Sequence, residues 1–159
     1  MAAFTPRQTT RNLDGRQTQV FLQTFGDRVL VLVTQLGKVG NLIQATLPAT
    51  APLMSNTADS SQPNKHLLPE PSPAVQLTSL LGSSPSAHLQ TLHSLYASQI
   101  ATIIWTEESK AGLEGLRRGV VVGLALHKLG ENEETQGGQR GREVFEGVMS
   151  MLYDLLKSR

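Results

Sequence analysis

A continuous run of five aliphatic residues, Val29-Leu30-Val31-Leu32-Val33, constrains this chain more than any other feature. If the run is a β-strand, both of its faces are apolar, because side chains alternate between the two faces of a strand. Strands of antiparallel sheets usually carry polar side chains on the face that meets water. A small domain with this strand must therefore cover the second face of its sheet, and we expect a partner molecule to do so.

Four strands joined by tight turns are expected in the first third of the chain. Asp14-Gly15 and Gly26-Asp27 are two-residue hairpin signals, the second with glycine in the first position of a type II′ turn. Gly37 and Gly40 bracket a third turn, where left-handed backbone is expected. The four strands are predicted at Thr5–Arg11, Gln17–Phe25, Arg28–Gln35 and Asn41–Leu47.

The rest of the chain is expected to add two strands and two helices. Ser84-Pro85 has the residues of a helix start, and an apolar stripe continues from there to about Thr106. The segment 107–118 is open between continued helix and turn. The further elements are predicted at Ala74–Leu81 and Gly119–His127 as strands, and at Arg142–Lys157 as the closing helix.

Two segments lack any apolar period. Residues 48–73 are rich in proline and serine, and residues 129–141 are rich in glutamate, glycine and glutamine, so both are predicted to be mobile loops. The chain as a whole, residues 1–159, is predicted to be one α+β domain. Its core would be an antiparallel six-stranded, meander-type sheet with two helices on one face.

The hairpin at Gly26-Asp27 assigns the two faces of this sheet. A two-residue turn pairs Phe25 with Arg28, Gln23 with Leu30 and Phe21 with Leu32. Val20, Leu22 and Thr24 then share a face with Val29, Val31 and Val33, and this nearly pure aliphatic set is expected under the helices. The opposite face mixes apolar and polar groups as a subunit interface does. The predicted partner interface consists of Gln19, Phe21, Gln23, Phe25, Leu30 and Leu32.

The composition argues against several classes of function. The chain has no cysteine, which excludes disulfides and thiol nucleophiles, and its net charge of +1 gives no basic footprint for nucleic acid. No serine lies in a Gly-x-Ser-x-Gly elbow. The histidines, which are His66, His88, His93 and His127, have no metal-ligand spacing. We therefore expect no enzyme activity, no metal and no cofactor.

Nothing in the sequence resembles a signal peptide, and no segment approaches the roughly 18 apolar residues of a membrane helix. We expect a cytoplasmic protein that binds no membrane, with the nucleus as an open alternative. Lys38 lies between the two turn glycines, and two interpretations of it stay open: an exposed contact for a partner, or a solubilising turn residue.

The phrase Val33-Thr34-Gln35-Leu36-Gly37-Lys38-Val39-Gly40 closely resembles the third proteasome assembly chaperone family. Members of that family carry a strand, then Val-Thr-Gln, a hydrophobic residue, Gly-Lys, a hydrophobic residue, Gly, and another strand. The resemblance is specific over roughly Asp14–Leu47. It is thinner in the second half, where the linkers look longer than the family's usual loops.

This resemblance implies a non-enzymatic α+β protein that forms a heterodimer with a related subunit like the fourth assembly chaperone. It also implies that the pair seats alpha-type subunits, in particular the alpha-5 type, as the outer ring of the proteasome core is built. Whether the isolated chain is a monomer or a homodimer stays open. The alternative is a small dimeric scaffold of the longin or roadblock kind, although those folds usually place a helix between their second and third strands.

Overall fold

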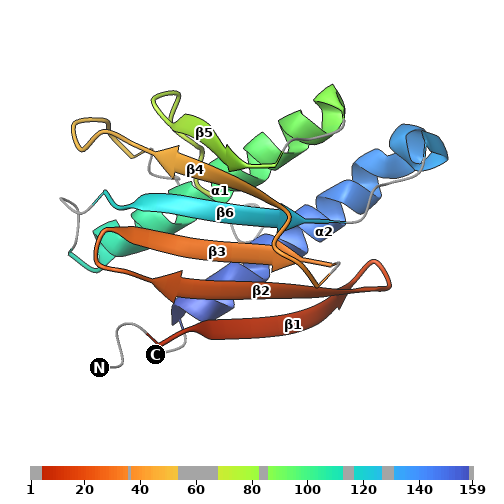
Figure 1. The fold of residues 1–159 in the computed structure, drawn as a ribbon, viewed down its shortest axis with the longest axis horizontal. Coiled ribbons are helices and arrows are strands. Elements are labelled where there is room, and N and C mark those ends of the chain that lie inside the picture. Colours follow the sequence, from red (N-terminus) through yellow and green to blue (C-terminus); the bar gives the residue numbers. More distant parts are fainter. Residues whose placement is uncertain are drawn as a thin grey trace, which may run out of the picture.

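The computed structural model describes residues 5–35, 37–53, 68–82, 86–112, 117–126 and 131–157, with the backbone alone described over 131–140. These residues form one six-stranded sheet and two long helices (Figure 1), which confirms the predicted α+β class. In chain order the elements are β1 (Arg7–Leu13), β2 (Arg16–Thr24), β3 (Arg28–Thr34), β4 (Asn41–Thr46), β5 (Gln76–Leu81), α1 (Ala87–Lys110), β6 (Gly119–Ala125) and α2 (Glu131–Lys157).

The strands lie in the order β1-β2-β3-β6-β4-β5. All neighbouring pairs are antiparallel except β3 and β6, which run parallel. The predicted meander is therefore right for β1 to β3, but the expected continuation into β4 is wrong because β6 lies between β3 and β4. As a consequence, the segment that joins β3 to β4, residues 35–40, has to cross the end of β6 (Figure 1). We call this segment the crossover.

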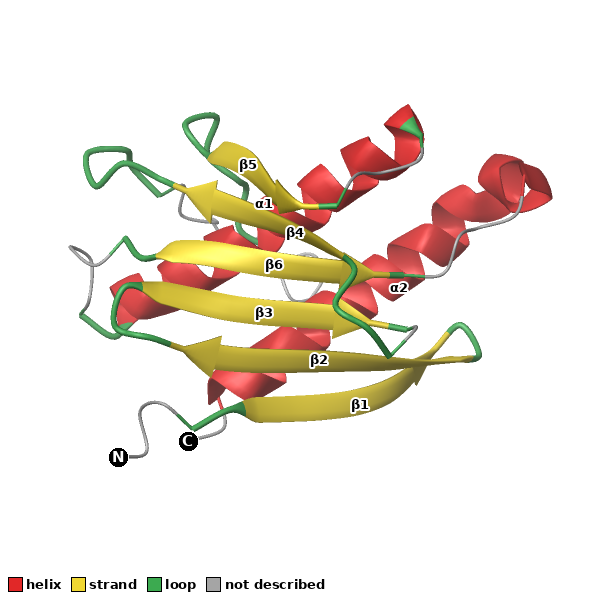
Figure 2. Cartoon of the chain, in the orientation of Figure 1, coloured by secondary structure: helices red, strands yellow, loops and turns green. Residues whose placement is uncertain are grey.

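Both helices pack on the same face of the sheet, which we call the covered face, and Figure 2 shows them behind the strands. α1 packs on β4 and β6, α2 packs on β1 and β2, and the two helices also contact each other. No described helix lies on the opposite face, which we call the open face. Within the described residues, the helices therefore cover one face of the sheet and leave the other face without a helix.

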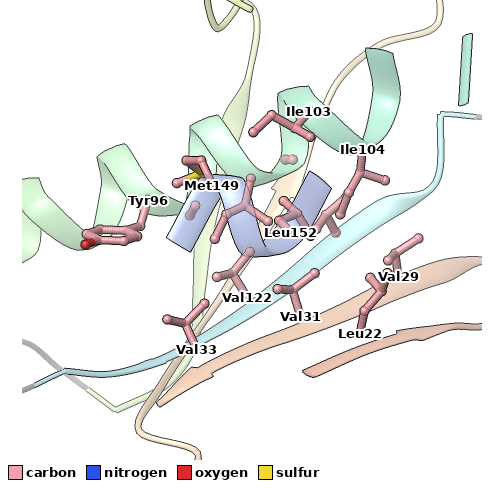
Figure 3. Packing of buried hydrophobic residues seen from close by; sticks show 14 of the residues in the cluster. Leu22, Val29, Val31, Val33, Tyr96, Ile103, Ile104, Val122, Met149 and Leu152 are labelled. Carbon is pink, nitrogen blue, oxygen red and sulfur yellow. The ribbon is translucent and has the colours of Figure 1, made fainter. Parts of the chain in front are cut away.

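The aliphatic residues expected under the helices are buried there. The five that alternate along β2 and β3 are at most 2% exposed; they are Val20, Leu22, Val29, Val31 and Val33. Figure 3 shows several of them facing side chains of both helices, among them Ile103 and Ile104 from α1, and Met149 and Leu152 from α2. Burial of these side chains is the main stabilising contribution in a core with few aromatic rings.

The two hairpins set the register of the first three strands. Asp14 and Gly15 have φ angles of 52° and 73°, as a type I′ turn requires. In the second hairpin, the N–H of Phe25 donates to the carbonyl oxygen of Arg28 at 2.7 Å, so the loop has two residues. The pairing of β2 with β3 is the predicted one. Gly26 does not have a positive φ, however, so the expected type II′ turn is wrong.

The helix boundaries differ from those predicted. Ser86 is the N-cap of α1, since its Oγ accepts the N–H of Leu89 at 3.2 Å, whereas Ser84-Pro85 lies outside the described residues. α1 continues into the segment 107–118 and ends at Lys110, past the expected end at Thr106. α2 begins at Glu131 rather than Arg142. The expected linker is therefore wrong over 131–141, which is helical.

The ends of the proline-rich segment 48–73 pack against the domain. Gln99 of α1 donates from Nε2 to the carbonyl oxygen of Pro69 at 2.8 Å, and both residues are buried. Leu53 near the start of the segment and Leu68 near its end pack against the core. Residues 54–67 lie outside the described residues, so the mobility expected for them stays a prediction.

Candidate partner-binding surface

One row of residues crosses all six strands on the open face, with a register irregularity beside Leu42 where β4 pairs with β5. Its members are paired with one another from strand to strand: Gln8 with Phe21, Phe21 with Leu32, Leu32 with Gly123, Gly123 with Leu42, and Leu42 with Leu81. We call these six residues the central row. Four of them carry large apolar side chains, and Gln8 lies at one end. A contiguous apolar row of this kind is a typical protein–protein contact.

At Gly123, side chains from the neighbouring strands cover the backbone of β6. A Cβ atom on Gly123 would lie 2.5 Å from Cδ2 of Leu32 and 3.1 Å from Cδ2 of Leu42. The two leucines therefore lean toward each other across a residue that has no side chain. Because of this arrangement, the aliphatic surface continues across β6 without a break.

A second row follows beside the central row and is more polar. Gln23 pairs with Leu30, Leu30 with Val121, and Val121 with Gln44. Further glutamines on this face include Gln19, whose Nε2 donates to Oε1 of Gln8 at 2.8 Å. The glutamines around the central row carry uncharged amides, which can donate and accept hydrogen bonds without the desolvation cost of a full charge.

The crossover forms a raised rim at one end of the open face. The carbonyl oxygen of Val39 lies 3.1 Å from the position that a Cβ of Gly123 would occupy, and the Val39 side chain is 44% exposed. A polar hollow of about 280 Å³ lies between this rim and the β1–β2 hairpin, with Gln19, Thr34 and Gly37 among its lining residues. Apolar and polar features therefore stand side by side on this surface.

The sequence phrase that contains Thr34 and Gly40 builds the crossover. The Oγ1 of Thr34 accepts the N–H groups of Gly37 at 2.8 Å and of Lys38 at 3.2 Å. Gln35 donates from Nε2 to Oγ1 of the buried Thr18 at 3.1 Å. Gly40 has a φ of 70°, and a Cβ there would lie 2.1 Å from the carbonyl oxygen of Leu124. Only glycine fits this close approach to β6.

The structure distributes the predicted interface residues as follows. Phe21, Leu30 and Leu32 lie on the open face and are partly buried by their neighbours, with Gln19 and Gln23 beside them. Phe25 lies beyond the end of β2 and is 42% exposed. Its carbonyl oxygen accepts Nη1 of Arg118 at 2.8 Å, which ties the hairpin to the start of β6.

Lys38 lies on the crossover and is exposed. Its position next to the rim of the open face is compatible with either of the two interpretations given above.

Sequence reasoning missed half of the open face. Val121 and Gly123 reach it because β6 enters the middle of the sheet, and no local signal specifies that pairing. Leu42 and Gln44 could have been found from the alternation along β4, once its neighbour was known. Leu81 is 61% exposed and belongs to β5, an edge strand in which every residue is exposed.

A buried histidine, His93, lies away from this surface. His93 is 7% exposed, and burial lowers its pKa below the ordinary value of 6.5. Nδ2 of Asn41 lies 3.3 Å from Nδ1 of His93, so the neutral ring accepts a hydrogen bond there. His66 and His127 lie outside the described residues. Within the described part, no group of three or more histidine, cysteine, aspartate or glutamate side chains is gathered as a metal site requires.

Comparisons with known proteins find similarity in structure but not in sequence. No family model matches this chain, and no curated protein matches it in sequence. The chain is similar in fold to a solved structure described as a novel chaperone complex for yeast 20S proteasome assembly. The similarity covers 93% of this chain and 98% of the other, with 10% sequence identity and a TM-score of 0.48. Among the described helices, none is long and apolar enough to span a membrane.

Proposed function

We propose that this chain is one half of a dimeric assembly chaperone for the proteasome core. In this proposal the open face binds a related chaperone subunit, and the pair seats alpha-type subunits, the alpha-5 type in particular, during formation of the outer ring. The chain is proposed to act in the cytoplasm, without catalysis and without a cofactor.

One observation carries the binding half of the proposal: the central row is apolar across five strands and has no helix of the described chain over it. Exposed apolar surface of this kind is unfavourable by roughly 25 cal/mol per Å². The sheet of a related subunit is an occupant of suitable shape, because two sheets pack face to face about 10 Å apart with interdigitated side chains. The glutamines around the row would supply the polar rim of such a contact.

The choice of the proteasome as the assembled object is supported by the sequence phrase at residues 33–40. Its threonine, its glutamine and its two glycines each have a defined part in the crossover, as described above. The phrase therefore specifies an unusual local structure rather than a common turn, and a resemblance in it is correspondingly specific.

Of the two arguments against the alternative, a longin or roadblock scaffold, one fails and one holds. The continuous four-strand meander that was expected to distinguish this chain from those folds is wrong. The two-residue turn between β2 and β3, however, stands where those folds usually place a helix. This observation favours the assembly-chaperone proposal.

The test is a pull-down of the tagged chain from cell extract, followed by mass spectrometry. The expected result is recovery of one small partner and of proteasome alpha-type subunits, whereas trafficking or signalling proteins would contradict the proposal. A Phe21→Glu variant should lose the small partner, because a charge would enter a desolvated contact. The matched control is Leu95→Glu, which places the same charge at an exposed apolar residue of α1, and which should recover the partner normally.

A further inference from the structure

A second apolar site lies between the two helices, on the covered side of the sheet and so opposite to the central row. It is a cavity of about 520 Å³ between the first turns of α1 and residues 141–145 of α2. The β1–β2 hairpin and the segment after β6 close it on the sheet side. This volume lies within the range of about 300–1,000 Å³ that is typical of small-molecule sites.

The wall of the cavity is aliphatic and aromatic. Leu92 and Leu95 of α1 and Val144 of α2 line it, together with Tyr96 and Phe145. The two rings meet edge to face, with centroids 4.9 Å apart and an interplanar angle of 70°. Leu95 is 56% exposed, so this part of the wall is not covered by the described chain.

Two polar side chains of the cavity lining, Gln99 and His93, make hydrogen bonds within the protein. Gln99 donates to the carbonyl oxygen of Pro69, and His93 is in contact with the amide of Asn41. These groups are neutral or engaged, and burial holds the pKa of His93 below its ordinary value. The mainly apolar wall therefore favours an apolar group for the part of a ligand that enters the cavity.

The rim of the cavity carries an excess of positive charge. Among the described lining residues, Arg16 comes from the β1–β2 hairpin and Arg142 from α2, against one acidic residue, Asp14. Within the described part of the chain, the guanidinium groups of Arg16 and Arg142 make no ion pair. Guanidinium groups bind carboxylates in a fork geometry that neutral or cationic headgroups do not match.

From these observations we infer that the cavity binds a single-chain amphiphile with a carboxylate headgroup, such as a fatty acid. The alkyl chain lies between α1 and α2 against Leu92 and Phe145, and the carboxylate lies at the rim beside Arg16 and Arg142. This inference does not depend on the proposed partner, because the cavity shares no residue with the central row.

The test uses laurate below its micellar concentration, measured by calorimetry with the full chain. We expect saturable binding, and weaker binding of dodecyltrimethylammonium, which has the same alkyl chain and a cationic head. The double variant Arg16→Gln and Arg142→Gln should lose about tenfold in affinity for laurate. Arg28→Gln, which removes an exposed arginine of the β2–β3 hairpin, is its matched control and should bind laurate unchanged.

A second pair of variants tests the apolar wall. Leu95→Asp should weaken laurate binding, because it places a charge in the apolar wall that contacts the alkyl chain, whereas Leu80→Asp on the exposed strand β5 should not. Three results would overturn the inference: no saturable binding of laurate, equal binding by the double variant and by Arg28→Gln, or loss of laurate binding in a Phe21→Glu variant. A fourth would be co-sedimentation with phosphatidylserine vesicles that depends on Arg16 and Arg142, which would assign the arginines to a membrane surface.

Discussion

Leu32 on β3 lies over the bare backbone of Gly123 on β6, so that a Cβ atom added to Gly123 would meet Cδ2 of Leu32 at 2.5 Å. The two residues belong to the only parallel strand pair of the described sheet. Because Gly123 has no side chain, Leu32 and Leu42 can lie close to the backbone of β6. A larger residue on β6 would lift Leu32 and Leu42 away from the sheet and break the continuity of the apolar surface.

Gly123→Ala is therefore expected to destabilise the protein by about 1–2 kcal/mol, since overpacking of a filled site forces side chains to shift. The contacted atoms of the two leucines are the ends of flexible side chains, which keeps the cost moderate. Urea denaturation followed by fluorescence of the single tryptophan, Trp105, measures the free energy of unfolding. An unchanged midpoint would mean that the leucines are not held over Gly123.

The crossover allows a comparison of two glycines that have almost the same backbone conformation. Gly37 and Gly40 have φ angles of 71° and 70°, but a Cβ on Gly37 has open space, whereas one on Gly40 would lie 2.1 Å from the carbonyl oxygen of Leu124. Gly37→Ala should cost about 1 kcal/mol of stability, from the left-handed backbone alone. Gly40→Ala should cost about 4 kcal/mol or more, because the backbone of β6 cannot yield. Equal effects in urea denaturation would show that the crossover does not pass close to β6.

The burial of His93 predicts a pH dependence of stability. Its folded-state pKa lies below the unfolded value of 6.5, so the unfolded chain takes up a proton first as the pH falls. The stability that His93 contributes is therefore fully present above about pH 6.5 and is lost as the pH falls below that value toward the folded-state pKa. His93→Gln should reduce this loss between pH 7.5 and pH 5.5, measured by urea midpoints.

His88 provides the matched control for that measurement, because it is exposed on the same helix. His88→Gln should leave the difference between the two pH values as it is in the parent protein. If both variants behave alike, the acid sensitivity comes from other groups and the prediction for His93 is wrong.

The parts of this fold that could be predicted from the sequence are those that depend on neighbours along the chain. The register of β2 against β3 follows from a two-residue turn, and the alternation of Val29, Leu30 and Val31 then assigns the two faces. The place of β6 could not be predicted in this way. Its pairing with β3 joins Leu32 to Gly123, and nothing in the local sequence specifies a contact over such a separation.

The candidate site shows the same division. Phe21 and Leu32 were predicted because one hairpin places them together. Val121 and Leu42 were missed because they reach the open face only after β6 has entered the sheet. The start of α2 was missed for a different reason: residues 131–141 include several glycines, which have low helix propensity, and propensity is a weak guide where packing decides.

The proposed use of the open face gives the last prediction. Leu32→Asp should abolish binding of the related partner subunit while the fold survives, because Leu32 is only partly buried in the single chain and would be desolvated in the complex. Size-exclusion chromatography with the partner measures association, and circular dichroism measures the fold.

Gln23→Lys is a milder variant on the same face, and it should weaken association without any loss of fold. Leu95→Asp on α1 controls for the added charge. An intact complex with Leu32→Asp would place the partner elsewhere on the molecule, and a loss of fold in Leu32→Asp together with normal association of Gln23→Lys would contradict the assignment of this face as the interface.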